Sequence, residues 1–386
     1  MDKVLHFLPD EKIANRIIKI FEEALPGKNL FLVTSRRKQY TYIQTGNGII
    51  SLQEFQDMSD MQRWDTVKYV VIHNLTHCAL NVADKYLPKG MPTYWVIWGM
   101  DLYNVLLAPK GFPLYDNDNP FKSNLNTRWK NIWASMKARR VRKFVEKKVT
   151  HIMTDTTDND YQMLVQYYPE MASKQHVPFF YYPIDELLGP LVDQSVNTGR
   201  ESNVYGGIQV GNSCSPTNNH LYAFKILSTF DLHNRPICVP LSYSIREYYR
   251  KPVLEGGQQF FGDQFHPVLD FMPLDDYSRM MCNNTVVVYA NFRQEAIGNI
   301  LTSLYLGAKV FLSKYSPVHE WARSIGVELF VLEEMTQESL DTPLSSAKQR
   351  VHRERLMELY NTNRMIEIIR TCFTETVKSP VSNLQL

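Results

Sequence analysis

The sequence predicts two α/β domains, each built on a parallel sheet with helices on both faces. Short apolar, β-branched runs alternate with segments of helical periodicity along most of the chain, as in parallel sheets covered by helices. The alternation stops in the polar segment 185–205 and then starts again, which indicates a domain boundary. A length of 386 residues with 44% apolar residues suits two cores. We therefore expect a first domain at 1–190 and a second at 206–340.

In the first half, the apolar runs and the helical patterns follow one another in order. Asp10 is a residue that starts helices, and apolar residues then recur at helical spacing from Ile13 until Pro26. The expected strands are 4–8, 29–34, 69–73, 93–98, 151–154 and 177–182. The expected helices are 10–25, 78–86, 128–148 and 158–168.

The second half repeats this pattern and ends in a helical segment. Its expected strands are 207–210, 237–241, 268–272, 286–289, 310–312 and 329–332, and its expected helices are one beginning near 218, 244–259, 274–282, 294–306 and 317–325. Residues 341–373 are expected to be helical and to pack back across the domains, whereas 374–386 form a loose tail. Ligands of parallel sheets bind at the carboxyl ends of the strands, so the strand-to-helix turns are the places to search.

The composition excludes several classes of protein. Forty-two basic and 40 acidic residues give a net charge of +2, which argues against a dedicated nucleic-acid binder. The five cysteines are scattered without a CxxC pair. We therefore expect neither a disulfide framework nor a zinc site, and we expect the protein to lie in a reducing compartment. The first residues lack a signal-peptide core, and no run approaches the ~20 apolar residues of a membrane span. A cytoplasmic protein is expected, with membrane contact only at its surface.

The first candidate site is the turn 211–220, which follows the strand 207–210. Gly211 lets a ligand come close to the backbone, because it has no side chain. Small polar residues supply hydrogen-bond donors; these are Asn212, Ser213 and Asn218. The amino terminus of the next helix attracts anions, so a diphosphate suits this turn. The alternative interpretation is a turn that only caps its helix.

The second candidate site is the turn 289–299. Arg293 precedes an apolar helix and suits a phosphate, and Gly298 within the first turns indicates that something comes close there. The alternative interpretation is a surface arginine that pairs with a neighbouring acid.

In the first half, Asp101 and His73 come at the ends of apolar strands. At the cleft, either group would accept the proton of a hydroxyl nucleophile. The alternatives are that Asp101 caps the next helix and that His73 is a structural histidine.

Residues 128–148 carry nine basic residues and one acid. Five apolar residues fall on roughly one helical face: Trp129, Ile132, Trp133, Met136 and Phe144. With Lys137, Arg139, Arg140, Arg142 and Lys143, this face suits an anionic membrane surface. The alternative is that the apolar stripe packs on the domain core and the charges are merely solvated.

No metal site is expected. The segments 116–118 and 158–160 have Asp-x-Asp spacing, but they lie in polar loop or helix-start sequence where Asp and Asn are common anyway.

Four motifs in order resemble one known family. They are Val-Ile-Trp-Gly-Met-Asp-Leu-Tyr (96–103), Val-Gly-Asn-Ser-Cys-Ser-Pro-Thr-Asn-Asn-His (210–220), Val-Pro-Leu-Ser-Tyr (239–243) and Phe-Arg-Gln-Glu-Ala-Ile-Gly-Asn (292–299). The chain resembles the TDP-N-acetylfucosamine:lipid II N-acetylfucosaminyltransferases, also called 4-alpha-L-fucosyltransferases or glycosyltransferase family 56. The resemblance implies a GT-B fold of two Rossmann-like domains around a cleft, with the nucleotide-sugar donor held mainly by the second.

The resemblance also implies the reaction and its residues. The family transfers 4-acetamido-4,6-dideoxygalactose from a TDP donor to an undecaprenyl-diphosphate-linked saccharide, at the cytoplasmic face of the bacterial inner membrane, in the assembly of surface polysaccharides such as enterobacterial common antigen, O-antigen or capsule. The implied donor residues are Gly211, Asn212, Ser213, Asn218, Tyr243, Arg293, Gln294, Glu295, Gly298 and Asn299. The implied acceptor-side residues are His73, Trp98, Asp101 and Tyr103. Two positions depart from the family: Glu295 replaces a Gln, and Ser242 replaces a Gly.

These observations predict a metal-independent, cofactor-free glycosyltransferase that is peripheral to the membrane. Asp101 is the first candidate for acceptor activation and His73 the second. The alternatives are a nucleotide-sugar epimerase of the same fold and a non-catalytic, membrane-associated scaffold of polysaccharide assembly.

Overall fold

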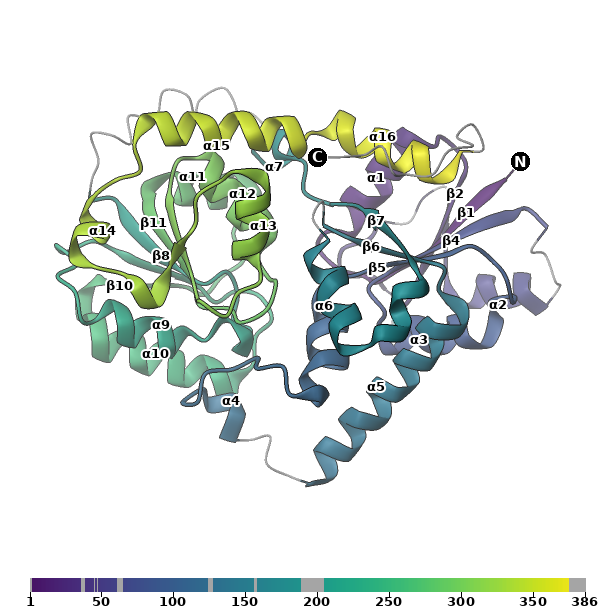
Figure 1. Cartoon of the computed structure of the whole chain (residues 1–386), viewed down its shortest axis with the longest axis horizontal. Coiled ribbons are helices and arrows are strands. Elements are labelled where there is room, and N and C mark those ends of the chain that lie inside the picture. The colour runs from purple at the N-terminus through teal and green to yellow at the C-terminus, as the bar shows by residue number, and fades with distance from the viewer. Residues whose placement is uncertain are drawn as a thin grey trace. The chain divides into compact units, whose positions relative to one another are not determined.

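A computed structural model describes residues 2–374 except 36–38, 45, 47, 61–64, 124–127, 156–157 and 189–204. The chain forms two α/β units (Figure 1). Unit 1 comprises Met1–Phe112, Asn131–Tyr181 and Thr362–Leu386, and unit 2 comprises Pro113–Lys130 and Tyr182–Asn361. None of the helices described in these ranges is both long enough and apolar enough to span a bilayer.

The sheet of unit 1 is parallel, as predicted. Its order is β3-β2-β1-β4-β5-β6-β7. The strands are β1 (Lys3–Leu8), β2 (Asn29–Val33), β3 (Ile49–Ile50), β4 (Val67–His73), β5 (Thr93–Val96), β6 (His151–Thr154) and β7 (Gln175–Pro178). In the centre of the sheet, β5 is buried throughout and β4 is buried from Val70 to His73, because helices cover both faces of the sheet.

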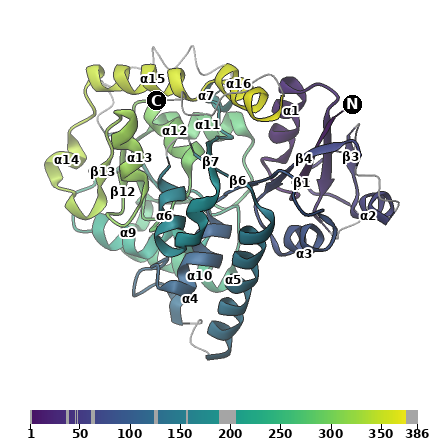
Figure 2. The same ribbon diagram turned by 45° about the vertical axis from the view of Figure 1, so that its right-hand side comes forward.

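The helices of unit 1 include one from the far end of the chain. They are α1 (Ala14–Ala24), α2 (Leu52–Asp60), α3 (His77–Tyr86), most of α5 (Arg128–Lys148), α6 (Asn159–Tyr167) and α16 (Thr362–Phe373). Helix α16 lies beside α1 in both views (Figures 1 and 2), and the ring of Phe373 packs 4.8 Å from that of Tyr94. Helix α16 packs its apolar face against the core of unit 1, and Met365 and Ile369 on this face are fully buried.

Unit 2 repeats the architecture with the order β10-β9-β8-β11-β12-β13, again parallel. Its strands are β8 (Gly207–Val210), β9 (Ile237–Pro240), β10 (Phe265–Val268), β11 (Asn284–Tyr289), β12 (Lys309–Leu312) and β13 (Phe330–Val331). Its helices are α4 (Pro120–Ser123), α7 (Ile184–Leu188), α9 (His220–Leu227), α10 (Glu247–Phe261), α11 (Leu274–Asn283), α12 (Ile297–Tyr305), α13 (Val318–Ile325), α14 (Gln337–Asp341) and α15 (Ser346–Leu359). Figure 1 shows α9 and α10 on one face of the sheet and α12 and α13 on the other.

Several expected boundaries differ from the structure. The strand expected at 268–272 is β10 at Phe265–Val268, because Pro267 lies on an edge strand where its missing N–H costs no ladder bond. The strand expected at 177–182 is β7 at Gln175–Pro178, which is also an edge strand. The helix expected from 294 begins at Ile297, so Gln294 and Glu295 lie in the turn.

The expected domain limits also differ from the observed units. The segment Pro113–Lys130 belongs to unit 2 rather than to the first domain, and the change of unit falls between Tyr181 and Tyr182. The helical segment expected at 341–373 is divided between α15 in unit 2 and α16 in unit 1. The polar linker at 189–204 and the tail from 375 lie outside the described residues.

A buried arginine joins the amino ends of three adjacent strands in unit 2. Arg235, 1% exposed, lies just before β9. Its Nε donates to the carbonyl of Gly206 at 2.7 Å, and its Nη2 donates to Oγ1 of Thr285 at 2.8 Å. Burial lowers the pKa of Arg235 to about 10, so the guanidinium stays charged at neutral pH. These bonds hold β8, β9 and β11 in register at the end opposite the turns 211–220 and 289–299.

We expect Arg235→Ala to lower the free energy of unfolding by about 3 kcal/mol or more, because it leaves a cavity and buried acceptors without donors. Denaturant unfolding measures this. Arg279→Ala is the matched control, because Arg279 forms an exposed ion pair with Asp276 and should contribute less than about 1 kcal/mol. Equal effects of the two substitutions would show that Arg235 does not hold the strands.

Candidate functional site

The two turns predicted from the sequence lie side by side in unit 2. Strand β8 pairs directly with β11, with Val210 opposite Val288, so the turns that follow these strands are neighbours. Each turn ends in a residue with left-handed backbone just before its helix: Asn219 has a φ of 49° and Ala296 a φ of 63°. Such a conformation costs an alanine about 1 kcal/mol, and strain of this kind concentrates at functional sites.

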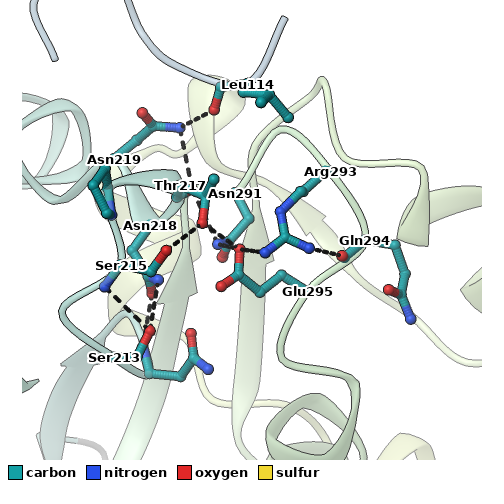
Figure 3. Close-up of polar contacts among 12 residues, drawn as sticks. Leu114, Ser213, Ser215, Thr217, Asn218, Asn219, Asn291, Arg293, Gln294 and Glu295 are labelled. Carbon is teal, nitrogen blue, oxygen red and sulfur yellow. Dashed lines mark hydrogen bonds and ion pairs between the residues drawn. The ribbon is translucent and has the colours of Figure 1, made fainter. Parts of the chain in front are cut away.

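One carboxylate oxygen, Oε2 of Glu295, connects the two turns. It accepts hydrogen bonds from Oγ1 of Thr217 at 2.6 Å and from Nδ2 of Asn291 at 2.9 Å. It also forms an ion pair with Nη2 of Arg293 at 3.0 Å. Figure 3 shows these three groups converging on Glu295, with Nη1 of Arg293 directed to the carbonyl of Gln294 at 3.1 Å. Glu295, which departs from the family pattern, is therefore the centre of the cluster.

Arg293 keeps unused hydrogen-bonding capacity. Its side chain is 9% exposed and that of Glu295 is 13% exposed. The Nε group of Arg293 has no hydrogen-bond partner among the described residues. Arg293 therefore does pair with a neighbouring acid, Glu295, as the alternative interpretation expected. The pair nevertheless leaves the buried Nε–H of Arg293 without an acceptor among the described residues. An anion at this turn would complete its hydrogen bonds.

Hydrogen bonds to strand β11 and within the turn itself hold the turn 211–220 in place. The N–H of Gly211 donates to the carbonyl of Val288, and the N–H of Asn212 donates to Oδ1 of Asn218, both at 2.9 Å. Nδ2 of Asn218 donates to Oγ of Ser213 at 3.2 Å. These contacts make Asn218 and Ser213 structural supports of the turn, which favours the capping interpretation for this half of the site.

The two glycines are required by neighbours within unit 2. A Cβ at Gly211 would lie 2.5 Å from Nε2 of His220, and Gly211 has a φ of +71°. A Cβ at Gly298 would lie 2.9 Å from the ring of Tyr182. The expectation that something comes close at Gly298 fits this contact, in which the neighbouring group is a tyrosine ring, and a role of Gly298 in holding a diphosphate stays a prediction.

The remaining donor-side residues are placed around these turns. The carbonyl of Tyr243 accepts the N–H of Cys214 at 2.8 Å, which joins the turn after β9 to the turn after β8. Asn299 lies half-buried in the first turn of α12, where its carbonyl accepts the hydroxyl of Ser303. Sequence analysis missed Thr217 and Asn291, whose only signal was that both are polar and follow buried strands.

Asp101 is buried at the carboxyl edge of the sheet of unit 1 and is 1% exposed. Its Oδ2 accepts the N–H of Leu75 at 3.0 Å and Nε1 of Trp95 at 2.7 Å, and its Oδ1 accepts the N–H of Trp98 at 3.0 Å. Burial raises the pKa of Asp101, and the backbone and indole donors act in the opposite direction. This arrangement favours the structural alternative, in which Asp101 holds the turns after β4 and β5 together.

His73 is also fully buried, and both of its ring nitrogens have partners. Nε2 lies 3.0 Å from Nδ1 of His6, and Nδ1 contacts the hydroxyl of Tyr181. Nδ2 of Asn29 donates to backbone carbonyls, so Oδ1 of Asn29 accepts from Nε2 of His6. Burial lowers the pKa of both histidines, to about 3 for His6. Both rings are therefore neutral, and Nδ1 of His73 accepts the proton of Tyr181, which again favours a structural role.

The two aromatic residues of the acceptor side differ from each other. Tyr103 is buried, and its hydroxyl donates to Oδ1 of Asp160 at 2.5 Å. Trp98 is half-buried, and its Nε1 has no partner among the described residues. Residues Met100–Leu107 form a π-helix directly after this tryptophan, a local distortion that is frequent at functional sites. Of the two, only Trp98 remains a candidate for substrate contact.

Comparison with known families identifies the chain. Residues 129–356, more than half of the sequence, match the family described as 4-alpha-L-fucosyltransferase glycosyl transferase group 56. The chain belongs to this family. It is a glycosyltransferase, and the turns 211–220 and 289–299 lie within the matched residues, whereas the motif 96–103 lies before them.

Solved structures that resemble this glycosyltransferase show the fold. The alpha,alpha-trehalose 6-phosphate synthase of Burkholderia multivorans is 10% identical, with a TM-score of 0.60 over 97% of this chain and 95% of that chain. Sucrose-phosphate synthase of Thermosynechococcus elongatus is 11% identical, with a TM-score of 0.59 over 97% and 98%. Anabaena HepE, solved with UDP-glucose, is 11% identical, with a TM-score of 0.61 over 96% and 99%. With its two parallel sheets, the glycosyltransferase has the predicted GT-B fold.

The basic helix α5 has two different halves. Ile132, Trp133 and Met136 near its amino end are 43%, 68% and 58% exposed. Phe144, expected on the same face, is instead buried with Val141 and Val145 in the core of unit 1. The carboxyl half of α5 therefore packs on the core, as the alternative expected, and the amino half leaves large apolar side chains exposed, where membrane contact stays a prediction. The side chain of Trp129 lies outside the described residues.

The five basic residues of α5 that were expected to face a membrane are all on the surface. Lys137, Arg139, and Lys143 are exposed, whereas Arg140 pairs with Asp84 at 3.7 Å and Arg142 with Glu170 at 2.6 Å. Within the described ranges, no group of three or more His, Cys, Asp or Glu side chains is arranged to hold a metal ion.

Asp101→Asn decides between the structural and catalytic roles of Asp101. We expect the free energy of unfolding to fall by about 2 kcal/mol or more, because an amide cannot accept all the buried donors that the carboxylate accepts. Denaturant unfolding measures the loss, and Asp84→Asn, at an exposed ion pair in the same unit, should change it by less than about 0.5 kcal/mol. A variant of unchanged stability that lost its turnover would instead identify Asp101 as the base.

Proposed function

We propose that the glycosyltransferase binds a nucleotide-diphospho-sugar at the carboxyl ends of β8 and β11, with the diphosphate against Arg293. The observation that carries this proposal is the buried guanidinium of Arg293, whose Nε has no hydrogen-bond partner among the residues that the structure describes. Helix α12 begins four residues after Arg293. Its amino terminus adds N–H groups that have no acceptor within the helix, and a partial positive charge, to the cation of Arg293. HepE, which shares the fold, has been solved with UDP-glucose.

These groups stabilise the leaving group of the transfer. A hydroxyl oxygen of the acceptor forms a bond to the anomeric carbon, and the bond from that carbon to the diphosphate oxygen breaks. The nucleoside diphosphate departs with the electron pair, and the hydroxyl proton leaves to a base. Negative charge therefore develops on the diphosphate, where a fixed cation and helix dipole lower the barrier most effectively. With Arg293 in this role, the reaction is proposed to need no metal ion and no cofactor.

Membership of the family supports a proposal for the substrates. We propose a TDP-linked 4-acetamido-4,6-dideoxygalactose or a similar deoxy-amino sugar as donor, and an undecaprenyl-diphosphate-linked saccharide as acceptor, in bacterial surface-polysaccharide assembly. The family description favours this transfer over a nucleotide-sugar epimerase or a scaffold. Product analysis with and without the lipid acceptor separates these functions, because an epimerase turns over without it and a scaffold forms no product.

A lipid-linked acceptor requires the enzyme to work at a membrane surface, and α5 suits this task. At 100° per residue, Ile132, Trp133 and Met136 share one helical face with Arg140 and Lys143. Figures 1 and 2 show the amino end of α5 extending past the helices beside it in unit 1. Exposed Trp and aliphatic groups next to cations favour an anionic interface. We therefore place the enzyme peripherally at the cytoplasmic face of the inner membrane.

Arg293→Ala tests the proposed donor site. We expect kcat/KM for the nucleotide-sugar to fall by about 100-fold, because charged hydrogen bonds to the leaving group are lost. The measurement is transfer to a lipid-linked acceptor, with TDP-, UDP- and GDP-sugars and with EDTA present or absent. Arg323→Ala is the control, since Arg323 forms an exposed ion pair with Glu320. Unchanged kinetics would remove Arg293 from the site, and loss of wild-type activity in EDTA would refute the metal-free mechanism.

A double substitution of Trp133→Ser with Met136→Ser tests the membrane surface. We expect at least a tenfold loss of binding to vesicles that contain anionic lipid, because two exposed apolar side chains no longer enter the interface. Sedimentation with vesicles measures it, with Val351→Ser as control for an exposed apolar residue of α15 in unit 2. If the double variant bound vesicles as well as the wild type, α5 would not be the membrane contact.

A further inference from the structure

A segment from the first half of the sequence is built into unit 2. Residues 114–121, here called the strap, lie between two stretches of unit 1 in the sequence but belong to unit 2. The strap reaches the turn 211–220 and ends in the short helix α4. Sequence analysis treated Asp116 to Asp118 only as polar loop, because nothing in the local pattern indicates a partner 100 residues away.

Asn219 joins the strap to both turns of the candidate site. Its Oδ1 accepts the N–H of Asp116 at 3.0 Å and Nδ2 of Asn119 at 2.8 Å. Its Nδ2 donates to the carbonyls of Leu114 at 3.3 Å and Ala290 at 3.0 Å. Figure 3 shows the bond to Leu114 beside the Glu295 cluster. One buried amide therefore holds the strap, the turn before α9 and the end of β11 together.

Further contacts fix the strap along its length. Nδ2 of Asn119 also donates to the carbonyl of Pro216 at 2.8 Å. The ring of Phe121 stacks on that of Tyr248 at 5.7 Å, and Asp118 forms an ion pair with Lys225. Asn119 and Leu114 are buried. The strap is thus seated on unit 2 by buried hydrogen bonds at its centre and by apolar contacts at both ends.

Tyr115 lies in the strap between Leu114, whose carbonyl accepts a hydrogen bond from Nδ2 of Asn219, and Asp116, whose N–H donates to Oδ1 of Asn219. Burial raises the pKa of Tyr115 to about 12, and the charges of Arg293 and Glu295 act on this pKa in opposite directions. Its ring packs 5.0 Å from that of Phe121. The structure gives the Tyr115 hydroxyl no hydrogen-bond partner among the described residues. The phenol is therefore a neutral O–H donor on the segment that Asn219 joins to both turns.

We propose that the strap completes the donor site: the Asn119–Asn219 pair positions the two turns, and Tyr115 donates a hydrogen bond to the diphosphate of the bound nucleotide. This inference rests on the proposed function, because it assigns a further residue to the same site. Asn119 acts through Asn219 and is a positioning residue. Tyr115 contacts the ligand directly.

Calorimetric titration of the full chain with TDP and with UDP tests the proposal. Tyr115→Phe removes one oxygen atom and should weaken binding of the preferred nucleotide by about tenfold, the effect of one hydrogen bond to a charged group. Asn119→Ala should weaken it by a similar factor and raise the KM of the nucleotide-sugar, while the KM of the acceptor stays unchanged. Tyr205→Phe and Asn363→Ala are the controls, because both residues are exposed, Tyr205 precedes the amino end of β8, and Asn363 belongs to unit 1.

The outcomes separate the two levels of the proposal. Weaker nucleotide binding in both variants, with wild-type binding in both controls, supports the strap's role. Wild-type binding by Tyr115→Phe and Asn119→Ala would overturn it and leave the proposed function intact. If the wild-type chain bound neither nucleotide, the proposed function would fail and this inference with it. Should Asn119→Ala fail to fold, Tyr115→Phe decides, since it preserves the packing of the ring.

Discussion

The ion pair of Arg293 with Glu295 is the interaction on which the candidate donor site depends. A cation buried in unit 2 needs a counter-charge, and Glu295 supplies it at 3.0 Å while also binding Thr217 and Asn291. The same carboxylate therefore retains the guanidinium and ties the turn after β8 to the turn after β11. A site with this charge balance holds an anion through the remaining donors of Arg293 rather than through excess positive charge. The carboxylate that departs from the family pattern is thus compatible with a diphosphate site.

Much of the fold could be predicted from the sequence because parallel strands and amphipathic helices leave local patterns. The runs that became β4, β8 and β11 are rich in Val and Ile, and the expected bounds of each lie within about two residues of the observed ones. The strand β3 has two residues, too few to show a period, and it was missed with the adjacent helix α2. The bounds expected for β10 were displaced, because Pro267 weakens the strand pattern of the sequence. An edge strand nevertheless accommodates this proline.

The site was predicted less completely, because its contacts join distant parts of the sequence. Arg293 and the two turns could be predicted because each turn follows an apolar strand and precedes a helix, whereas their adjacency appears only in the strand order of the sheet. The reason for Gly298 could not be predicted, because the ring that requires it belongs to Tyr182, 116 positions earlier. Asp101 and His73 were correctly placed at one sheet edge, but burial and complete hydrogen bonding appear only in three dimensions. A titratable residue at a strand end indicates an edge, not a catalytic role.

Amide hydrogen exchange with and without saturating TDP tests most directly whether the donor site lies at the carboxyl ends of β8 and β11. A diphosphate against Arg293 and the start of α12 should slow exchange in the peptide covering 291–299 and in the strap, with no change at the turns of unit 1 that contain Asp101 and His73. Protection confined to unit 1, or exchange of 291–299 that stayed unchanged while TDP was bound, would contradict this placement of the donor site.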